Sequence, residues 1–169
     1  MTIGKDFTET FGTYVLNQAW DFRTQGQDVL PTWFIVGDTV QIVGTPFDPS
    51  IPDAKYQIAT VVAEYVIKHH ANSVMFVSDA WVRSVPIEES LESAMDEARR
   101  KPVSQHVDAM ECIVLNVWNR DHTGYTIMRQ YRQADDGTLE ILCERRHEGQ
   151  PETETFEPVM EALYGGDRQ

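Results

Sequence analysis

Four polar side chains in two distant segments have the types that hydrolytic and transfer chemistry requires. Ser78 and Asp79 follow the apolar run 74–77, and Asp121 and His122 lie in a turn-rich stretch between two β-type runs. Functional groups collect where strands end, because the loops there leave the scaffold open. An aspartate that orients a histidine can make it a general base, so one interpretation is a small hydrolase or transferase that uses Asp79 and His122. In the other interpretation, Asp79 accepts backbone hydrogen bonds, while Asp121 and His122 occupy a solvated turn.

The usual motifs for cofactors and metals are missing from the chain. Its glycines form no GxGxxG or Walker phrase, and neither HExxH nor CxxC occurs. His69 and His70 would point about 100° apart on a helix, so they cannot bind one metal ion together. Cys112 and Cys143 lie in apolar alternating runs, which are typical of buried thiols rather than of a disulfide framework. We therefore expect no cofactor, no metal and a reducing, cytoplasmic environment.

The chain carries 27 acidic and 14 basic residues, a formal net charge of -13. Such a surface repels polyanions, and phosphate contacts need clustered Lys and Arg, so we expect no direct binding to nucleic acid. In one interpretation the acidity serves only solubility. In the other, the surface binds a basic partner, such as a nucleic-acid-binding protein, or imitates the row of backbone phosphates of DNA.

Two sets of residues could contact such a protein partner. The segment 87–100 has the apolar spacing of an exposed helix, and its acidic side chains form the expected first contact. Trp81 and Trp118 lie near strand ends, where a half-exposed ring can anchor a partner. Packing at the rim of the core is the alternative for both rings. The acidic residues of the segment are Glu88, Glu89, Glu92 and Asp96.

Hydrophobic spacing predicts an α+β fold with a single mixed, mainly antiparallel sheet of about six strands covered by helices. The run 74–77 is apolar at every position, which is typical of a central strand covered on both sides. Turn residues at 119–124 and 134–137 indicate a three-stranded meander. The expected elements are a helix over 7–23, a hairpin of 33–36 and 39–43, a helix over 53–70, the strand 74–77, the acidic helix 87–100, and strands at 112–118, 125–132 and 139–144.

The first helix illustrates the spacing on which these expectations depend. Its apolar residues recur three, four and seven positions apart, as on one face of a helix. They are Phe7, Phe11, Tyr14, Val15 and Phe22.

A length of 169 residues with 41% hydrophobic content suits one buried core. We expect a single domain over 1–148 and a polar C-terminal arm over 149–169. A short helix over 158–164 in this arm could dock through Val159, Met160 and Leu163. The chain has no run of about 18 apolar residues and no secretory signal, so we expect no membrane segment.

Two phrases of the sequence resemble a loose group of small uncharacterised bacterial and phage-borne proteins. The phrases are residues 76–81 (Phe-Val-Ser-Asp-Ala-Trp) and residues 111–114 (Glu-Cys-Ile-Val). In that group a hydrophobic strand ends in a Val-Ser-Glu-Ala-Trp type phrase, and an acidic residue before Ala or Cys opens the next strand. The resemblance covers residues 31–131, with Asp79 where the group tends to have Glu, and it implies no function that can be transferred.

These patterns together predict a non-enzymatic acidic binding or regulatory protein, encoded by a phage or mobile element, that acts through protein–protein contact. The hydrolase or transferase using Asp79 and His122 is one alternative. A structural homodimer subunit with an apolar, tryptophan-bearing interface is another.

Overall fold

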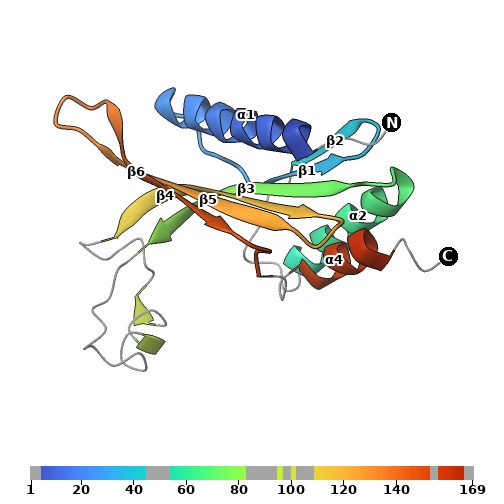
Figure 1. Ribbon diagram of the computed structural model, residues 1–169. Helices are drawn as coiled ribbons and strands as arrows, with labels where there is room; N and C mark the ends of the chain where they lie inside the picture. Colours follow the sequence, from blue (N-terminus) through green and yellow to red (C-terminus); the bar gives the residue numbers. More distant parts are fainter. Residues whose placement is uncertain are drawn as a thin grey trace.

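Among the residues that the structure describes, six strands form one antiparallel sheet with helices on both of its faces (Figure 1). The computed structural model describes residues 5–44, 54–82, 95–96, 100–101, 109–152 and 156–165. The strands lie in the order β2-β1-β3-β4-β5-β6. They are β1 (Thr32–Val36), β2 (Val40–Gly44), β3 (Ser73–Val82), β4 (Met110–Asn119), β5 (Gly124–Gln133) and β6 (Leu139–Glu148), and the helices are α1 (Lys5–Thr24), α2 (Ala54–Lys68) and α4 (Glu157–Tyr164). The predicted α+β architecture is confirmed.

Strand β3 lies inside the sheet and is covered on both sides, as its sequence predicts. Val74 and Phe76 face α2 and α4, whereas Met75 and Val77 face α1. Neighbouring side chains of a strand point to opposite faces, so a strand that is apolar at every position needs cover on both. Val74 and Met75 are completely buried. The two apolar clusters are therefore the two sides of one sheet.

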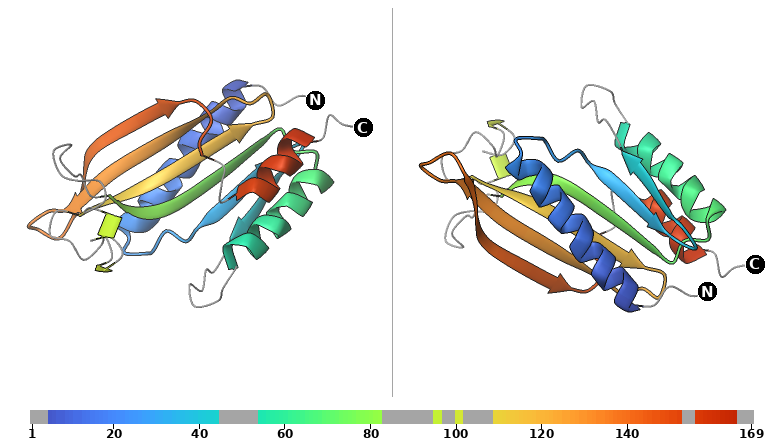
Figure 2. Two further views of the ribbon diagram at one scale, coloured as in Figure 1. Left: turned by 90° about the horizontal axis from the view of Figure 1, so that it is seen from below. Right: turned by 90° about the horizontal axis from the view of Figure 1, so that it is seen from above.

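Helix α1 crosses one face of the sheet, above β3 and β4 (Figure 2). Its buried side chains Val15, Leu16 and Ala19 pack in the cluster on this face. The guanidinium of Arg146, on the border strand β6, donates two hydrogen bonds to Glu9, of 2.8 and 2.6 Å. A bidentate pair of this kind fixes orientation as well as distance, so it ties the start of α1 to β6.

The other face is covered by α2 together with α4, which lie side by side (Figures 1 and 2). Rings of Trp33, Trp118 and Phe156 meet at the centre of this face, with Trp33 and Trp118 stacked at 6.0 Å between centroids and Phe156 edge-on to both. Helix α4 adds three buried apolar side chains to the same cluster, so the C-terminal segment takes part in the core. These three are Val159, Met160 and Leu163.

Gly12 allows α1 to lie directly against the sheet. A Cβ atom at this position would overlap the hydroxyl of Tyr125 on β5 and touch the side chain of Leu115 on β4. The Tyr125 hydroxyl is itself buried and has no hydrogen-bond partner within the described ranges. The contact between α1 and the sheet at Gly12 is therefore one of close packing and not a hydrogen bond.

We predict that Gly12→Ala destabilises the protein, even though alanine favours a helix interior over glycine by about 1 kcal/mol. Overpacking a close-packed contact costs about 1 to 3 kcal/mol, so the net effect should be a loss. Tyr125→Phe removes the overlapping oxygen, and adding Gly12→Ala to that variant should then be neutral or stabilising. Denaturant unfolding of the four proteins measures this double-mutant cycle. An equal loss from Gly12→Ala in both backgrounds would contradict the contact.

Candidate functional site

An apolar groove of about 510 Å³ lies between α1 and the β1–β2 hairpin. We call it the α1 groove. Its side chains include Leu30, which is 60% exposed, and Ile42, which is 66% exposed. Large apolar side chains that gather at a surface commonly mark a binding site. The largest side chains that line the α1 groove are Tyr14, Phe22, Leu30, Phe34 and Ile42.

Tyr14 and Phe22 stand in the helical wall of the α1 groove, and Tyr14 continues an aromatic stripe along α1. The ring of Phe7 stacks on that of Phe11, and Phe11 stacks on Tyr14, with centroids 5.8 and 6.1 Å apart. Phe11 also meets the edge of Phe34 on β1 at 5.7 Å, which joins the stripe to the floor of the groove. Phe7, Tyr14 and Phe22 are exposed, so the apolar side of α1 is wider than the area that the core buries.

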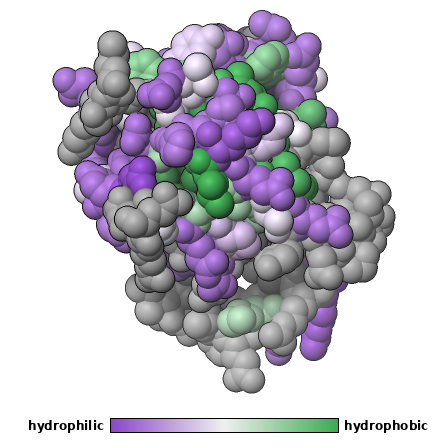
Figure 3. All heavy atoms as spheres, turned by 90° about the vertical axis from the view of Figure 1, so that its right-hand side faces the viewer, coloured by the Kyte–Doolittle hydropathy of each residue, from purple (hydrophilic) through white to green (hydrophobic). Residues whose placement is uncertain are grey.

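The charge around the α1 groove is negative. Asp28 is the one charged residue among the described residues that line it, and its side chain is exposed. Asp21 on α1 and Asp38 in the β1–β2 turn are exposed as well, but neither lines the groove. Figure 3 shows the right-hand side of the molecule in Figure 1, where apolar side chains reach the surface in patches among hydrophilic ones. The groove thus combines apolar contact area with one acidic residue, Asp28, in its lining.

A second, smaller pocket of about 150 Å³ lies at the end of α1, where Asp79 projects from β3. The backbone N–H of Val29 donates to the Asp79 carboxylate at 3.3 Å. The Asp79 side chain is exposed, yet partial desolvation by its neighbours raises the pKa of Asp79 above its ordinary value, and the Val29 hydrogen bond and the charge of Arg23 oppose this effect. Arg23 donates to the Tyr131 hydroxyl at 3.0 Å and pairs with Glu111 at 3.4 Å. Its donors are thus engaged within the protein rather than directed at a substrate.

The structure separates Asp79 from His122, so direct cooperation between them as a catalytic pair is excluded. Asp79 pairs with Ile113, whereas the turn that carries His122 adjoins the pair Ser73–Asn119. Six residues of strand correspond to about 20 Å. The two side chains also lie on opposite faces, because Asp79 contacts the end of α1 and His122 stacks on α4. The hydrolase or transferase interpretation fails because antiparallel pairing puts the β4–β5 turn at the opposite end of β3.

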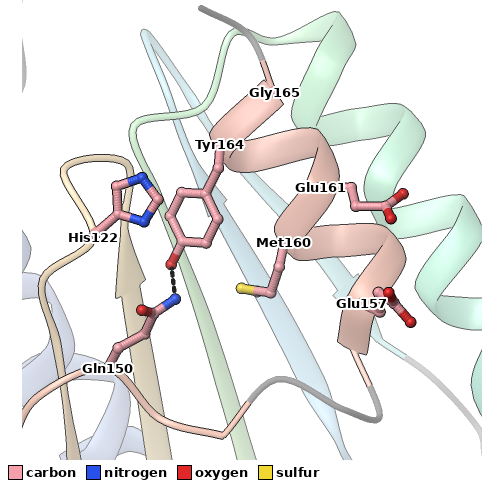
Figure 4. Close-up of a pocket in the computed structure, with 7 residues that line it drawn as sticks. All are labelled: His122, Gln150, Glu157, Met160, Glu161, Tyr164 and Gly165. Carbon is pink, nitrogen blue, oxygen red and sulfur yellow. Dashed lines mark hydrogen bonds between the residues drawn. The ribbon is translucent and has the colours of Figure 1, made fainter.

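His122 and Asp121 have structural contacts in the turn. The His122 ring stacks on Tyr164 of α4 at 4.1 Å between centroids. Gln150 donates to the Tyr164 hydroxyl at 2.5 Å (Figure 4), and burial raises the pKa of this tyrosine. Asp121 accepts hydrogen bonds from the backbone N–H and the hydroxyl of Thr123, at 3.1 and 2.5 Å. The Asp121 contacts order the β4–β5 turn, and the His122 stack holds this turn against α4.

The depression beside this stack has a volume of about 760 Å³. In Figure 4, His122, Tyr164 and Gln150 gather on one side of α4, while the carboxylates of Glu157 and Glu161 lie away from them. The acids and the imidazole therefore do not converge on one point, as acid–base chemistry would require.

The two tryptophans weighed as contact anchors have different environments. Trp81 is 43% exposed near the end of β3, so its ring remains accessible. Trp118 is completely buried, and its Nε1 donates to the carbonyl of Pro151 at 3.2 Å. The anchor interpretation is therefore wrong for Trp118, because α2, α4 and the segment before α4 cover its ring. Ser78, the neighbour of Asp79, points to the opposite face from that carboxylate.

The acidic residues Glu88, Glu89 and Glu92 lie outside the described residues. Asp96 is described, and it is an exposed helical residue. The expected contact through this acidic segment stays a prediction.

Sequence reasoning missed two residues of the α1 groove, Leu30 and Ile42. Leu30 precedes Pro31 outside any predicted element, and Ile42 belongs to an apolar run that reads as an ordinary strand. The available signal was the width of the apolar side of α1, from Phe7 to Phe22, which exceeds what one core face buries.

Within the described part of the chain, no group of three or more His, Cys, Asp or Glu residues could hold a metal ion. Cys112 and Cys143 are both free, and burial raises the pKa of the Cys112 thiol to about 11. No described helix has the length and apolar character to cross a membrane.

Comparisons of the chain with protein-family models, with curated proteins and with solved structures find no match. The case for a function therefore depends on the geometry above.

We predict that Asp79→Asn stabilises the protein at about pH 7. A carboxyl whose folded-state pKa is raised contributes stability at low pH that is lost as the pH rises through that pKa. Asparagine keeps an acceptor for the Val29 N–H and removes the charge, so the gain over the natural protein should vanish at about pH 3. Thermal unfolding at both pH values measures this difference.

Asp136→Asn is the matched control, because hydrogen bonds from Thr138 lower the pKa of the exposed Asp136. The pH dependence of stability has the opposite sign for Asp136: its ionised carboxylate stabilises the folded protein at neutral pH, and this stabilisation is lost in acid. If Asp79→Asn lowered the unfolding midpoint at neutral pH as Asp136→Asn should, the Arg23 charge would outweigh burial, contrary to the account given above.

Proposed function

We propose that this chain is a non-enzymatic, cytoplasmic binding protein whose α1 groove takes up a basic, apolar segment of a partner protein. The observation that carries the proposal is the convergence of large exposed apolar side chains from α1, β2 and the loop before β1 on one groove. Aromatic and aliphatic side chains in such positions dominate binding energy at protein interfaces.

The charge of the molecule supports a basic partner. The net charge is -13, and the charged residue lining the groove is the acidic Asp28. Complementary charge accelerates association and selects among partners more than it adds affinity. The apolar floor would then supply the affinity, and Asp28 together with the net negative charge the selectivity.

A cytoplasmic location is supported by the two cysteines. Both thiols are free, and Cys112 is completely buried. Structural disulfides are typical of oxidising compartments, whereas free buried thiols are common in reducing ones.

The experiment is selection from a library of random peptides displayed for binding to the full chain. We expect the selected peptides to combine apolar residues with Lys or Arg, and their affinity to fall as the salt concentration rises. Phe22→Ser and Leu30→Ser should each weaken binding by about tenfold, which corresponds to about 1.4 kcal/mol. Fluorescence anisotropy with labelled peptides measures these affinities.

The matched control is Ile67→Ser on α2, since Ile67 is 63% exposed on the other side of the sheet. This change should leave the affinity unaltered. Selected peptides that are acidic, or that bind the Leu30→Ser and Phe22→Ser variants as tightly as the natural protein, would rule out the α1 groove as the binding site.

A further inference from the structure

Strand β2 forms one border of the sheet, with β1 as its neighbour. Its register with β1 extends into the turn, where the N–H of Gly37 donates to the carbonyl of Thr39 at 3.0 Å. In an antiparallel ladder, pairs that exchange hydrogen bonds alternate with pairs that do not. The position of this bond therefore fixes which residues of β2 bond to β1.

Gly37 and Thr39 form such a hydrogen-bonded pair, so every second residue after Thr39 also bonds to β1. Gln41 and Val43 therefore direct their backbone groups toward β1. The residues between and beside them, Val40, Ile42 and Gly44, direct N–H and C=O outward from the sheet. The carbonyl of Val36 supports this alternation, because it accepts from the N–H of Asn72, next to β3, at 2.8 Å instead of bonding across to β2. The border of β2 thus presents donors and acceptors at a strand spacing.

The two borders of the sheet differ in their side chains. Strand β6 is rich in charge, and three of its charged residues are paired with neighbouring elements, namely Glu140, Glu144 and Arg146. Charged side chains are a common protection of sheet edges against added strands. Strand β2, with the sequence Val-Gln-Ile-Val-Gly, has no charged residue. Among the described residues, nothing gives β2 the protection that charge gives β6.

The open border of β2 is continuous with the α1 groove. Ile42 belongs to both: its backbone points outward from the sheet, and its side chain lines the groove opposite Phe34. A segment that paired with β2 would alternate its side chains above and below the sheet, so every second one would extend the apolar floor beside Ile42. A helix lying in the groove would leave the outward backbone groups of β2 unused.

From these observations we infer that the partner segment binds in extended form and adds a seventh strand to the sheet along β2. The inference depends on the proposed function, because it specifies how the same groove holds its ligand. Backbone hydrogen bonds to Val40, Ile42 and Gly44 supply part of the affinity. Pockets for alternate side chains, together with Asp28 and the net negative charge of the chain, select apolar residues interspersed with Lys or Arg.

A segment of another protein fits this border better than a second copy of the chain does. Two copies would each bring a net charge of -13, and the turn beside β2 carries the exposed Asp38. Repulsion between like-charged surfaces opposes that association, whereas a basic segment is attracted.

The first test compares two variants at one position, using a peptide selected on the natural protein. Ile42→Ala and Ile42→Pro both remove the groove side chain, but only proline also removes the outward N–H. Proline at an outward-facing position of a border strand is compatible with the sheet. We expect Ile42→Pro to bind at least about fivefold more weakly than Ile42→Ala, the value of one hydrogen bond of about 1 kcal/mol. Thermal unfolding verifies that both variants are folded.

The second test leaves the protein unchanged and N-methylates the bound peptide one residue at a time. An added strand turns every second N–H toward β2, so methylation at alternate residues should abolish binding and methylation between them should be tolerated. The alternating methylation pattern and the difference between the Ile42 variants are independent results. Either one would support strand addition by itself, even if an Ile42 variant failed to fold.

The possible results separate the two proposals. If methylation is tolerated throughout and Ile42→Pro equals Ile42→Ala, while Phe22→Ser still weakens binding, strand addition is wrong and the groove function stands. If no peptide binds in a manner that depends on Phe22 and Leu30, both proposals fail. If light scattering shows a dimer without peptide that Ile42→Pro disrupts, β2 pairs with a second copy and the basic segment is not its occupant.

Discussion

Burial of the four apolar residues 74–77 on both sides of the sheet is the constraint on which the rest of the structure depends. Because neighbouring side chains of β3 point in opposite directions, helices must cover both faces, and α1 covers one while α2 and α4 share the other. A helix is about 10 Å wide and strands lie about 4.8 Å apart, so a single helix covers about two strands. Helix α1 lies above β3 and β4, and no other described helix covers the floor that β1 and β2 form beside it.

The α1 groove follows from this unequal cover. On the face with two helices, α2 and α4 cover the apolar side chains, including the aromatic cluster around Trp118. On the other face, Phe34 and Ile42 form a floor that has α1 as its one helical wall. Removing water from such a floor is favourable at about 25 cal/mol per Å² of apolar surface, which gives a partner segment a source of affinity. In the proposed function, Asp28 and the net charge of -13 then favour basic sequences. Within the described residues α1 is the one helix on this face, and this unequal cover accounts for both the apolar site and its open strand border.

The sequence predicted the elements well because each has a clear period. Helical spacing located α1 and α2, and alternation with turn residues located the hairpin and the meander. Spatial relations between distant elements could not be predicted. Nothing in the sequence shows which end of β3 lies beside the β4–β5 turn. The predicted catalytic pairing of Asp79 with His122 is therefore wrong. Likewise, Trp81 and Trp118 have similar local contexts, and only the placement of α2, α4 and the segment before α4 buries the second. The resemblance to phage-borne proteins stays a prediction.

Residue-resolved amide hydrogen exchange of the free protein reports on both the sealed centre of the sheet and its border at β2. We expect the slowest exchange in β3 and β4, which lie inside the sheet under both layers, and an alternation along β2 in which Gln41 and Val43 are protected while Ile42 exchanges rapidly. Uniform protection along β2, or fast exchange at Val74 and Met75, would contradict a sheet that is sealed at its centre and open at this border.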